Sequence, residues 1–265
     1  MELYDDHLHS AFSFDGQFEL DRICDEAKKK ELKGITLTEH VEFNNDPHAD
    51  RIVDVPAYQN AIEEARKKYP GLQIGMGLEV GLKNNVPQLQ HFVDQAPWDF
   101  CIGSLHIIDG VAVIHGDYIR DKEPKAACRR YFRLLAEVAV NIRLYDVLGH
   151  LDLFRRAVGW DDTDLNIIDY LDELDSIFSV LVANGRGIEL NTGGWRYHLD
   201  TPNPSLDILK RYRERGGEII TCGSDAHTLP SVGYRIADAY EILRLAGFRY
   251  LSRFEKRKIQ QIPLF

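Results

Sequence analysis

Apolar and polar positions along this chain predict strands and helices that follow one another in turn. After an apolar start at Leu3 and Tyr4, short apolar runs predict buried strands over residues 35–38, 73–80, 100–106, 146–150, 187–191 and 218–223. Between them, apolar residues recur at helical spacing and predict helices over residues 19–33, 56–69, 124–142, 166–184, 205–215 and 233–245. Residues 43–55 are rich in Asn, Asp and Pro and predict a long loop of the kind that often covers a site.

This alternation predicts an α/β fold with a single domain over residues 1–265. Strands that alternate with helices of ten or more residues form parallel βαβ units, and several such units in one chain indicate a TIM-like barrel. The 265 residues contain no low-complexity linker or internal repeat that would divide them. Barrels of about 250 residues commonly form one domain.

Histidines and carboxylates gather at the carboxyl ends of the predicted strands. They are His7, His9, Glu39, His40, Glu79, His106, His150, Asp225 and His227, together with Asn191. In a parallel barrel these ends converge on the face where such folds place their chemistry. Burying so many polar rings is costly unless something coordinates them. Imidazoles mixed with carboxylates therefore predict a site for zinc, iron or manganese.

The spacing of the first two histidines sharpens this prediction. In the segment Asp5-Asp6-His7-Leu8-His9, residues two apart on a strand point to the same side. His7 and His9 can therefore bind one ion, while Asp5 can orient one of the rings from behind.

Composition and net charge mainly exclude classes of function and location. The chain has 32 Lys and Arg against 42 Asp and Glu, a formal net charge of −10, which disfavours tight binding to a nucleic-acid backbone. The start MELYDDHLHS has no targeting pattern and no apolar run reaches the length of a membrane span, so we expect a cytoplasmic protein without a membrane partner. Cys24, Cys101, Cys128 and Cys222 form no C-x-x-C pair, and we expect small buried thiols in a reducing compartment.

Four ordered motifs resemble the polymerase-and-histidinol-phosphatase (PHP) superfamily and, within it, the histidinol phosphatases. They are DDHLH at 5–9, TEH at 38–40, GLEVG at 77–81 with GSLH at 103–106, and GSDAH at 223–227. GHLDL at 149–153 and NTGGWR at 191–196 are similar to segments that accompany these motifs. The resemblance spans nearly the whole chain. It implies a distorted (β/α)7 barrel with a trinuclear metal centre.

The resemblance also implies which residues hold the three metals. The first site would use His7, His9, Glu79 and Asp225, the second Asp15, His40 and His227, and the third Glu79 again as a bridge with His106 and His150. Glu39 stands where an aspartate is common in the family, and we interpret it as a residue that supports the ligands from behind.

The reaction implied by the resemblance is the hydrolysis of L-histidinol phosphate in histidine biosynthesis. Divalent metals lower the pKa of a bridging water and neutralise phosphoryl oxygens, so hydroxide can attack phosphorus in line. Asp225 could accept the proton of the nucleophile, and His227 or another nearby histidine could assist the leaving alkoxide. Guanidinium groups match phosphate geometry, so we expect Arg196, and then Arg155 or Arg156, to bind the phosphate.

Three other interpretations stay open on the sequence. A PHP phosphoesterase could act on another small ester or on a nucleotide, although the chain lacks a basic run interleaved with aromatic residues. A metal-dependent amidohydrolase also begins with His-x-His, but here no predicted strand ends in lysine. A non-catalytic barrel is disfavoured because each expected ligand position holds a competent residue. The sequence leaves the metal, the general acid and the oligomeric state open.

Overall fold

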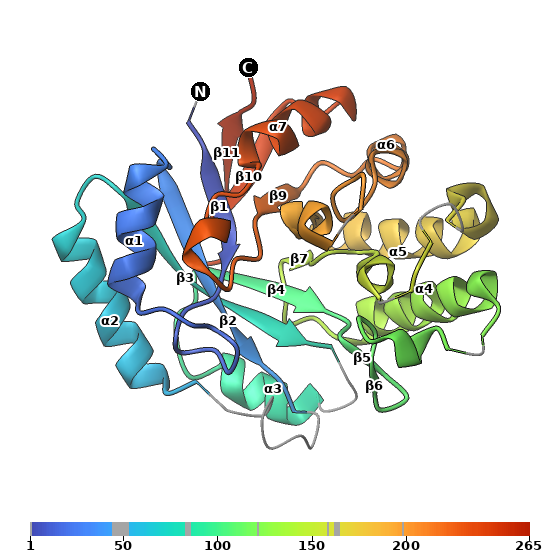
Figure 1. Ribbon diagram of the computed structural model, residues 1–265, viewed down its shortest axis with the longest axis horizontal. Helices are drawn as coiled ribbons and strands as arrows, with labels where there is room; N and C mark the ends of the chain where they lie inside the picture. Colours follow the sequence, from blue (N-terminus) through green and yellow to red (C-terminus); the bar gives the residue numbers. More distant parts are fainter. Residues whose placement is uncertain are drawn as a thin grey trace.

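The computed structural model shows a parallel sheet curled into a barrel with helices around it (Figure 1). The structure describes residues 2–43, 53–82, 86–120, 122–157, 159–161, 165–197 and 199–265. Across these ranges, parallel neighbours follow the order β1-β2-β3-β4-β7-β8-β9. The strands are β1 (Tyr4–Leu8), β2 (Gly34–Val41), β3 (Gln73–Gly81), β4 (Phe100–Ser104), β7 (Val147–Leu148), β8 (Gly187–Asn191) and β9 (Ile220–Gly223).

The first and last strands of this sheet meet at their carboxyl ends. The backbone N–H of Asp225 donates to His7 O over 2.8 Å, and the N–H of His9 donates to Ala226 O over 3.0 Å. Leu8 and Ala226 form a parallel bridge. The sheet is therefore nearly closed, and the predicted distorted (β/α)7 barrel is confirmed.

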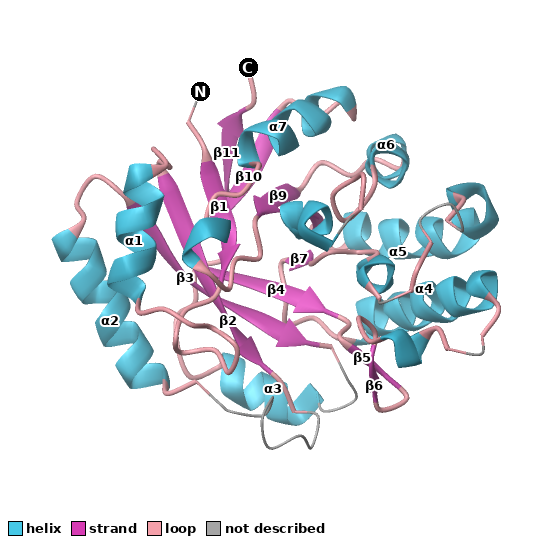
Figure 2. Cartoon of the chain, in the orientation of Figure 1, coloured by secondary structure: helices cyan, strands magenta, loops and turns pink. Residues whose placement is uncertain are grey.

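Helices cover the outside of the barrel, as the cyan ribbons of Figure 2 show. They are α1 (Leu20–Lys29), α2 (Val55–Lys68), α3 (Val86–Val93), α4 (Pro124–Asn141), α5 (Leu171–Ala183), α6 (Leu206–Glu214) and α7 (Ile236–Leu245). The amino end of α2 is capped by Asp54, whose side chain accepts from the N–H of Ala57 over 3.0 Å. Pro56 occupies the first turn of α2, where its missing N–H costs nothing.

The predicted elements occur in the structure in their predicted order, with ends that shift by up to four residues and with larger differences at four places. The strand predicted over 100–106 ends at Ser104, because the chain turns there toward the small hairpin of β5 (Ile107–Ile108) and β6 (Val111–Ala112). The helix predicted over 166–184 is a 3-10 turn, Ile167–Tyr170, followed by α5. Helix α3 and a carboxyl-terminal hairpin are absent from the prediction. Most of the loop predicted over 43–55, including Asp46 and Asp50, lies outside the described residues.

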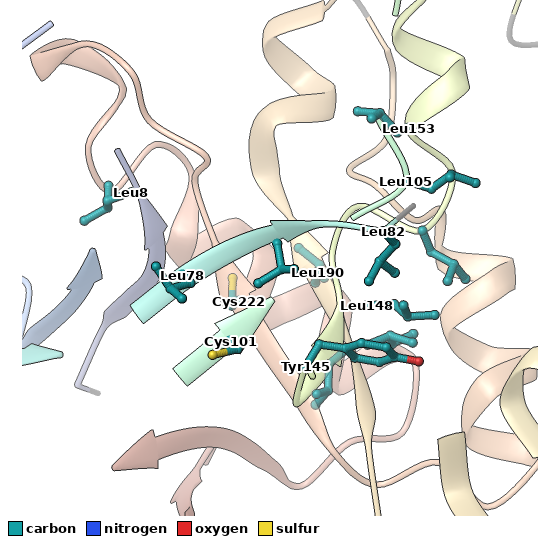
Figure 3. Close-up of a cluster of buried hydrophobic side chains, with 14 of the residues drawn as sticks. Leu8, Leu78, Leu82, Cys101, Leu105, Tyr145, Leu148, Leu153, Leu190 and Cys222 are labelled. Carbon is teal, nitrogen blue, oxygen red and sulfur yellow. The ribbon is translucent and has the colours of Figure 1, made fainter. Parts of the chain in front are cut away.

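Two groups of buried apolar side chains lie on opposite faces of the strands. Cys101 on β4 belongs to the larger group, shown in part in Figure 3 with Leu78 from β3 and Leu190 from β8. Phe100 and Ile102 alternate with Cys101 and therefore point to the other face, where they pack in a smaller group. All four cysteines are buried and free, which confirms the expected buried thiols. In the described part of the chain, no helix is long and apolar enough to cross a membrane.

The carboxyl-terminal hairpin of β10 (Tyr250–Glu255) and β11 (Lys258–Pro263) lies against the amino ends of the barrel strands. The guanidinium of Arg253 donates to both oxygens of Asp6 on β1, at distances of 2.8–3.1 Å. Arg257 donates to Asp146, which lies just before β7, over 2.8 Å. The ring of Phe254 stacks on Phe100 with 5.1 Å between centroids. This hairpin forms a floor at the end of the barrel opposite the polar strand ends.

Candidate metal centre

The carboxyl ends of the strands surround a cavity of about 580 Å³ that combines metal-ligating, basic and apolar side chains. Its polar lining includes Asp15, His40, Glu42, Glu79, His106, His115, His150, Arg156, Arg196, Asp225 and His227. Phe14, Ile107, Ile114, Leu153 and Tyr197 form much of its apolar lining. Pockets of this size that combine apolar walls with a few convergent polar groups are typical of small-molecule sites.

Glu79 lies at the centre of this cavity. One carboxylate oxygen, Oε1, lies 2.6 Å from Ser104 Oγ, 2.9 Å from His150 Nε2 and 3.2 Å from His106 Nε2. The other, Oε2, lies 3.2 Å from His7 Nε2, and the rings of His9 and His40 are within 3.4 Å of it. Glu79 is 1% exposed, so a single buried carboxylate touches five histidines.

The rings of His7 and His9 face each other in a way that requires a shared proton or a cation. Their Nε2 atoms are 3.1 Å apart, and Asp225 Oδ1 lies 3.7 Å and 3.5 Å from them. Two imidazole lone pairs this close repel each other unless a positive charge lies between them. Asp225 has φ 56°, in the left-handed region that a residue adopts only where its surroundings hold it there.

The second predicted group also comes together. Asp15 Oδ2 lies 3.0 Å from His227 Nε2 and 3.5 Å from His40 Nε2. The His9 ring stacks on both the His40 ring and the His227 ring, with centroids 4.3 Å and 4.2 Å away, and the centroids of those two rings are 5.9 Å apart. Asp15 precedes α1 in a segment with little regular structure, yet it reaches the histidines at the ends of β2 and β9.

Within the described residues, four groups have ligand atoms all within 4.8 Å of one another. They are His9, Asp15, His40 and His227; His7, His9 and Glu79; Glu79, His106 and His150; and His40, Glu42 and His106. Among the same residues, the buried atoms Asp15 Oδ1, His40 Nδ1 and His150 Nδ1 have no hydrogen-bond partner. Nitrogen and oxygen donors that are close, buried and unsatisfied fit divalent metal ions, and we assign the cluster as a divalent-metal site.

The charges of the cluster support this assignment. Burial alone would raise the pKa of Glu79, but the neighbouring His7, His106 and His40 hold that pKa well below its ordinary value. Burial lowers the pKa of His9 to about 3, with help from His227 and His40. Glu79 is therefore ionised and His9 neutral at physiological pH, as metal ligands must be. Burial would lower the pKa values of His7, His40 and His106, but neighbouring carboxylates raise them, so a metal that binds there displaces protons from these rings.

Three residues that the sequence analysis did not select hold the histidine rings from behind. Glu189 Oε1 lies 2.6 Å from His7 Nδ1, and Glu42 Oε1 lies 2.6 Å from His106 Nδ1. Ser13 Oγ lies 3.2 Å from His9 Nδ1. Partners of this kind fix the tautomer and orientation of ligating histidines. Glu42 and Glu189 each lie two residues from a selected strand-end residue, and this spacing was the signal available in the sequence.

Glu39 and Asp5, the two residues expected to support the ligands from behind, differ in what they contact. Glu39 is buried and accepts from the hydroxyls of Ser10 and Ser13 over 2.6 Å, and Ser13 contacts the His9 ring. Asp5 accepts from the N–H and hydroxyl of Ser224 and from the N–H of Gly233. The prediction that Asp5 orients a histidine ring is wrong, because Glu189 from another strand takes that place beside His7.

Of the three predicted arginines, two line the cavity and one does not. Arg156 lines the cavity and donates from Nη1 to Asp225 Oδ2 over 2.6 Å. Arg196, on the 3-10 helix η5 (Thr192–Tyr197), also lines the cavity and donates to the carbonyl oxygens of Ser224 and Asp225. Arg155 points away from the cavity and pairs with Asp152 over 2.8 Å. Its selection as a phosphate candidate is therefore not supported, and Arg156 and Arg196 remain.

Substitution of Glu189 by glutamine tests the support behind His7. We expect Glu189→Gln to weaken metal affinity by about 10–100-fold, because the ring loses the carboxylate that fixes its tautomer and raises its basicity. Competition with a chromogenic chelator measures this affinity. Glu63→Gln on the exposed face of α2 is the matched control. Equal metal affinity in the two variants would contradict the role given to Glu189.

The fold and the site together define an α/β-barrel metalloprotein whose ligands come from the carboxyl ends of successive strands. Comparison with protein families narrows this class. The PHP domain model matches residues 5–193, and the chain belongs to the PHP domain family.

The relatives that match nearly the full length of the chain are named as histidinol-phosphatases or probable histidinol-phosphatases. The chain is 29% identical over 266 residues to the histidinol-phosphatase of Lactococcus lactis, covering 98% of this chain and 97% of the relative. It is 28% identical over 257 residues to the probable histidinol-phosphatase of Clostridium acetobutylicum, covering 96% of this chain and 98% of the relative.

The solved structures agree with this likeness. Histidinol phosphate phosphatase from Lactococcus lactis, crystallised with zinc, L-histidinol and phosphate, is similar with a TM-score of 0.86 and 28% identity. The match covers 98% of this chain and 99% of that one. A putative histidinol phosphatase from Listeria monocytogenes has a TM-score of 0.77 over 89% of this chain and 99% of that one. At 18% identity, it shows the shared fold alone.

Proposed function

We propose that this protein is a metal-dependent phosphomonoesterase that hydrolyses L-histidinol phosphate to L-histidinol and phosphate. The observation that carries the proposal is the buried cluster around Glu79, which lies beside two cavity-lining arginines. The full-length likeness to a phosphatase crystallised with zinc, L-histidinol and phosphate supports the same substrate. The apolar wall formed by Ile107, Ile114 and Leu153 can contact the non-phosphate part of this ester.

We further propose that the cluster holds three divalent ions, of zinc, iron or manganese. His7, His9, Glu79 and Asp225 would hold the first, Asp15, His40 and His227 the second, and Glu79, His106 and His150 the third. When bound, such ions activate a water molecule as the nucleophile and neutralise phosphoryl oxygens. The protein supplies His7, His9 and His106 as ligands whose rings are held by Glu189, Ser13 and Glu42.

Asp225 and His227 are the groups that we propose to handle protons. Burial would raise the pKa of Asp225, but His7 and Arg156 hold it well below its ordinary value, so the carboxylate is ionised, as a metal ligand must be. Its role as acceptor of the nucleophile's proton stays a prediction. His227 Nδ1 lies 3.0 Å from the carbonyl oxygen of Asp225, which only accepts, so this nitrogen carries the hydrogen. Nε2 then presents a lone pair, which favours a ligand role. The assistance of His227 to the leaving alkoxide stays a prediction.

Phosphate release from a substrate panel tests the proposed function. L-histidinol phosphate, a simple phosphomonoester and a set of nucleotides are compared on protein whose zinc, iron and manganese contents have been measured. We expect preference for L-histidinol phosphate and loss of activity after chelation, with recovery when metal is returned. Metal-loaded protein that ignores this ester while cleaving a nucleotide would favour the alternative PHP phosphoesterase.

Arg196→Ala tests phosphate recognition. The guanidinium lies at the cavity wall and is held by two backbone carbonyls, so its removal takes away a charge without leaving a buried carboxylate unpaired. We expect KM for L-histidinol phosphate to rise about tenfold, the value of one charge-assisted hydrogen bond. Steady-state kinetics measure it against Arg211→Ala, whose guanidinium pairs with Asp175 on another helix. Equal KM in both variants would remove Arg196 from the site.

A further inference from the structure

Beneath Arg156, a chain of buried polar side chains takes no direct part in the proposed reaction. Arg156 Nε donates to Asn203 Oδ1 over 2.8 Å, and Asn203 Nδ2 donates to Asp152 Oδ1 over 2.7 Å. Asp152 Oδ2 in turn accepts from Arg155 Nη1 over 2.8 Å. Asn203 and Asp152 are 0% exposed, and Arg155 is 3% exposed. Buried polar networks hold their members rigidly when each group has a partner.

The chemistry of this chain fixes which way the Asn203 amide points. The Asp152 carboxylate only accepts hydrogen bonds, so the NH₂ group of Asn203 faces it and the carbonyl oxygen faces Arg156. Arg155 neutralises the charge of Asp152, which allows that carboxylate to stay buried. Asp152 and Arg155 therefore act on Arg156 through the orientation of Asn203.

A second branch joins Arg156 to the metal ligands. Arg156 Nη2 donates to Asn191 Oδ1 over 2.8 Å, and Asn191 Nδ2 donates to Glu189 Oε2 over 3.0 Å. The other oxygen of Glu189 lies 2.6 Å from His7 Nδ1. The guanidinium is thus held between Asn203 and Asn191, and Asn191 and Glu189 connect it by hydrogen bonds to the ring of His7.

These hydrogen bonds hold the Arg156 guanidinium in one orientation and leave some of its N–H groups available for an anion. Among the described residues, Asn203, Asn191 and Asp225 accept from three of its five N–H groups. The remaining two are on Nη1 and Nη2, and the side chain lines the cavity. A guanidinium fixed in advance loses less entropy when it binds a phosphate than one that must first be ordered.

We propose that Asn203, oriented by Asp152, is a positioning residue that fixes the guanidinium of Arg156 for the phosphate group of the substrate. The proposal rests on the proposed function, because it takes the cavity to be the place where a phosphate ester binds. Asn203 itself need not touch the substrate. Its effect on the reaction passes through Arg156.

A double-mutant cycle tests this role with metal-loaded, full-length protein. Wild type, Asn203→Ala, Arg156→Ala and the double variant are compared by calorimetric binding of inorganic phosphate and by kcat and KM for L-histidinol phosphate. We expect Asn203→Ala to weaken phosphate binding and raise KM about tenfold, with a smaller change in kcat. In the Arg156→Ala background the same substitution should change neither binding nor KM, because the residue through which it acts is gone.

Two further variants complete the design. Thr201→Ala removes a 2.7 Å hydrogen bond to Arg155 without touching Arg156, and it should leave phosphate affinity unchanged. Gly193→Ala would place a Cβ atom 2.7 Å from both Arg156 Nη2 and Asn191 Oδ1, so it should displace the guanidinium from Asn191 and weaken phosphate binding while Asn203 stays intact. Gly193→Ala carries the test if Asn203→Ala fails to fold.

The outcomes separate this role from the proposed function. An equal loss of phosphate affinity on Asn203→Ala in both backgrounds would overturn the positioning role, as would unchanged affinity in Asn203→Ala and Gly193→Ala. Wild-type protein that binds phosphate through Arg156 but does not hydrolyse L-histidinol phosphate would refute the proposed function and leave the positioning role standing.

Discussion

Replacing Glu79 by glutamine is expected to abolish phosphate-ester hydrolysis and to lower the metal content of the purified protein. The carboxylate of Glu79 lies within 3.4 Å of five histidine rings, and it is the one residue shared by two of the proposed metal sites. An amide of the same shape carries no charge and presents its NH₂ group to ligand nitrogens or to a cation. Loss of several kcal/mol of transition-state stabilisation corresponds to a fall in kcat/KM of about 10³-fold or more.

Metal analysis beside steady-state kinetics measures this effect. Ser104→Ala is an informative companion, because it removes only the hydroxyl that donates to Glu79 over 2.6 Å, and its effect should be much smaller. A Glu79→Gln protein with full metal content and wild-type kcat/KM would show that the cluster does not depend on a bridging carboxylate.

Replacing Arg253 by methionine is expected to lower the free energy of unfolding by about 3–5 kcal/mol. Both partners of the Arg253–Asp6 pair are buried, at 7% and 3% exposure, and the guanidinium also donates to Gln73 over 2.7 Å. Removing the arginine leaves the Asp6 carboxylate inside the barrel with Thr36 as its remaining hydrogen-bond donor among the residues that the structure describes. Urea unfolding of metal-loaded protein measures the change.

The control for Arg253→Met is Lys258→Met on the exposed side of β11, which should change stability by less than about 0.5 kcal/mol. Adding Asp6→Asn to Arg253→Met should recover part of the loss, since no unpaired charge is then buried. A loss below about 1 kcal/mol would show that solvent reaches Asp6 and that the hairpin does not seal the barrel.

The sequence predicted the barrel and most of the cluster because both are encoded locally. The period of apolar positions places each strand, and the last residues of each strand carry the ligand types, as in His7 and His9. Glu189 was missed because its partner His7 is 182 residues away, and only the closed barrel joins β1 to β8. Glu42 was missed because a glutamate after a strand is ordinarily a solvated charge.

The expectations for Arg155 and Asp5 that the structure does not support have a common physical origin. Arg155 and Arg156 are adjacent in the chain, but the 3-10 helix η2 (Leu153–Arg156) turns consecutive side chains in different directions. One enters the cavity and the other pairs with Asp152 behind it. Asp5 lies on β1 two residues before His7, but its carboxylate accepts from Ser224 and Gly233 and not from a histidine ring. Neighbourhood in sequence did not determine which way these side chains point.

The carboxyl-terminal hairpin of β10 and β11 affects the order in which the parts of the barrel can form during synthesis. Residues 250–263 follow all the strands of the barrel sheet in the chain, yet they supply the arginines for Asp6 and Asp146 beneath that sheet. A nascent chain that already contains every proposed metal ligand therefore still has buried carboxylates without their counter-charges. The metal-binding face is made by the ribosome first, and the ion pairs at the opposite end of the barrel form only when residues without any metal ligand have emerged and docked there.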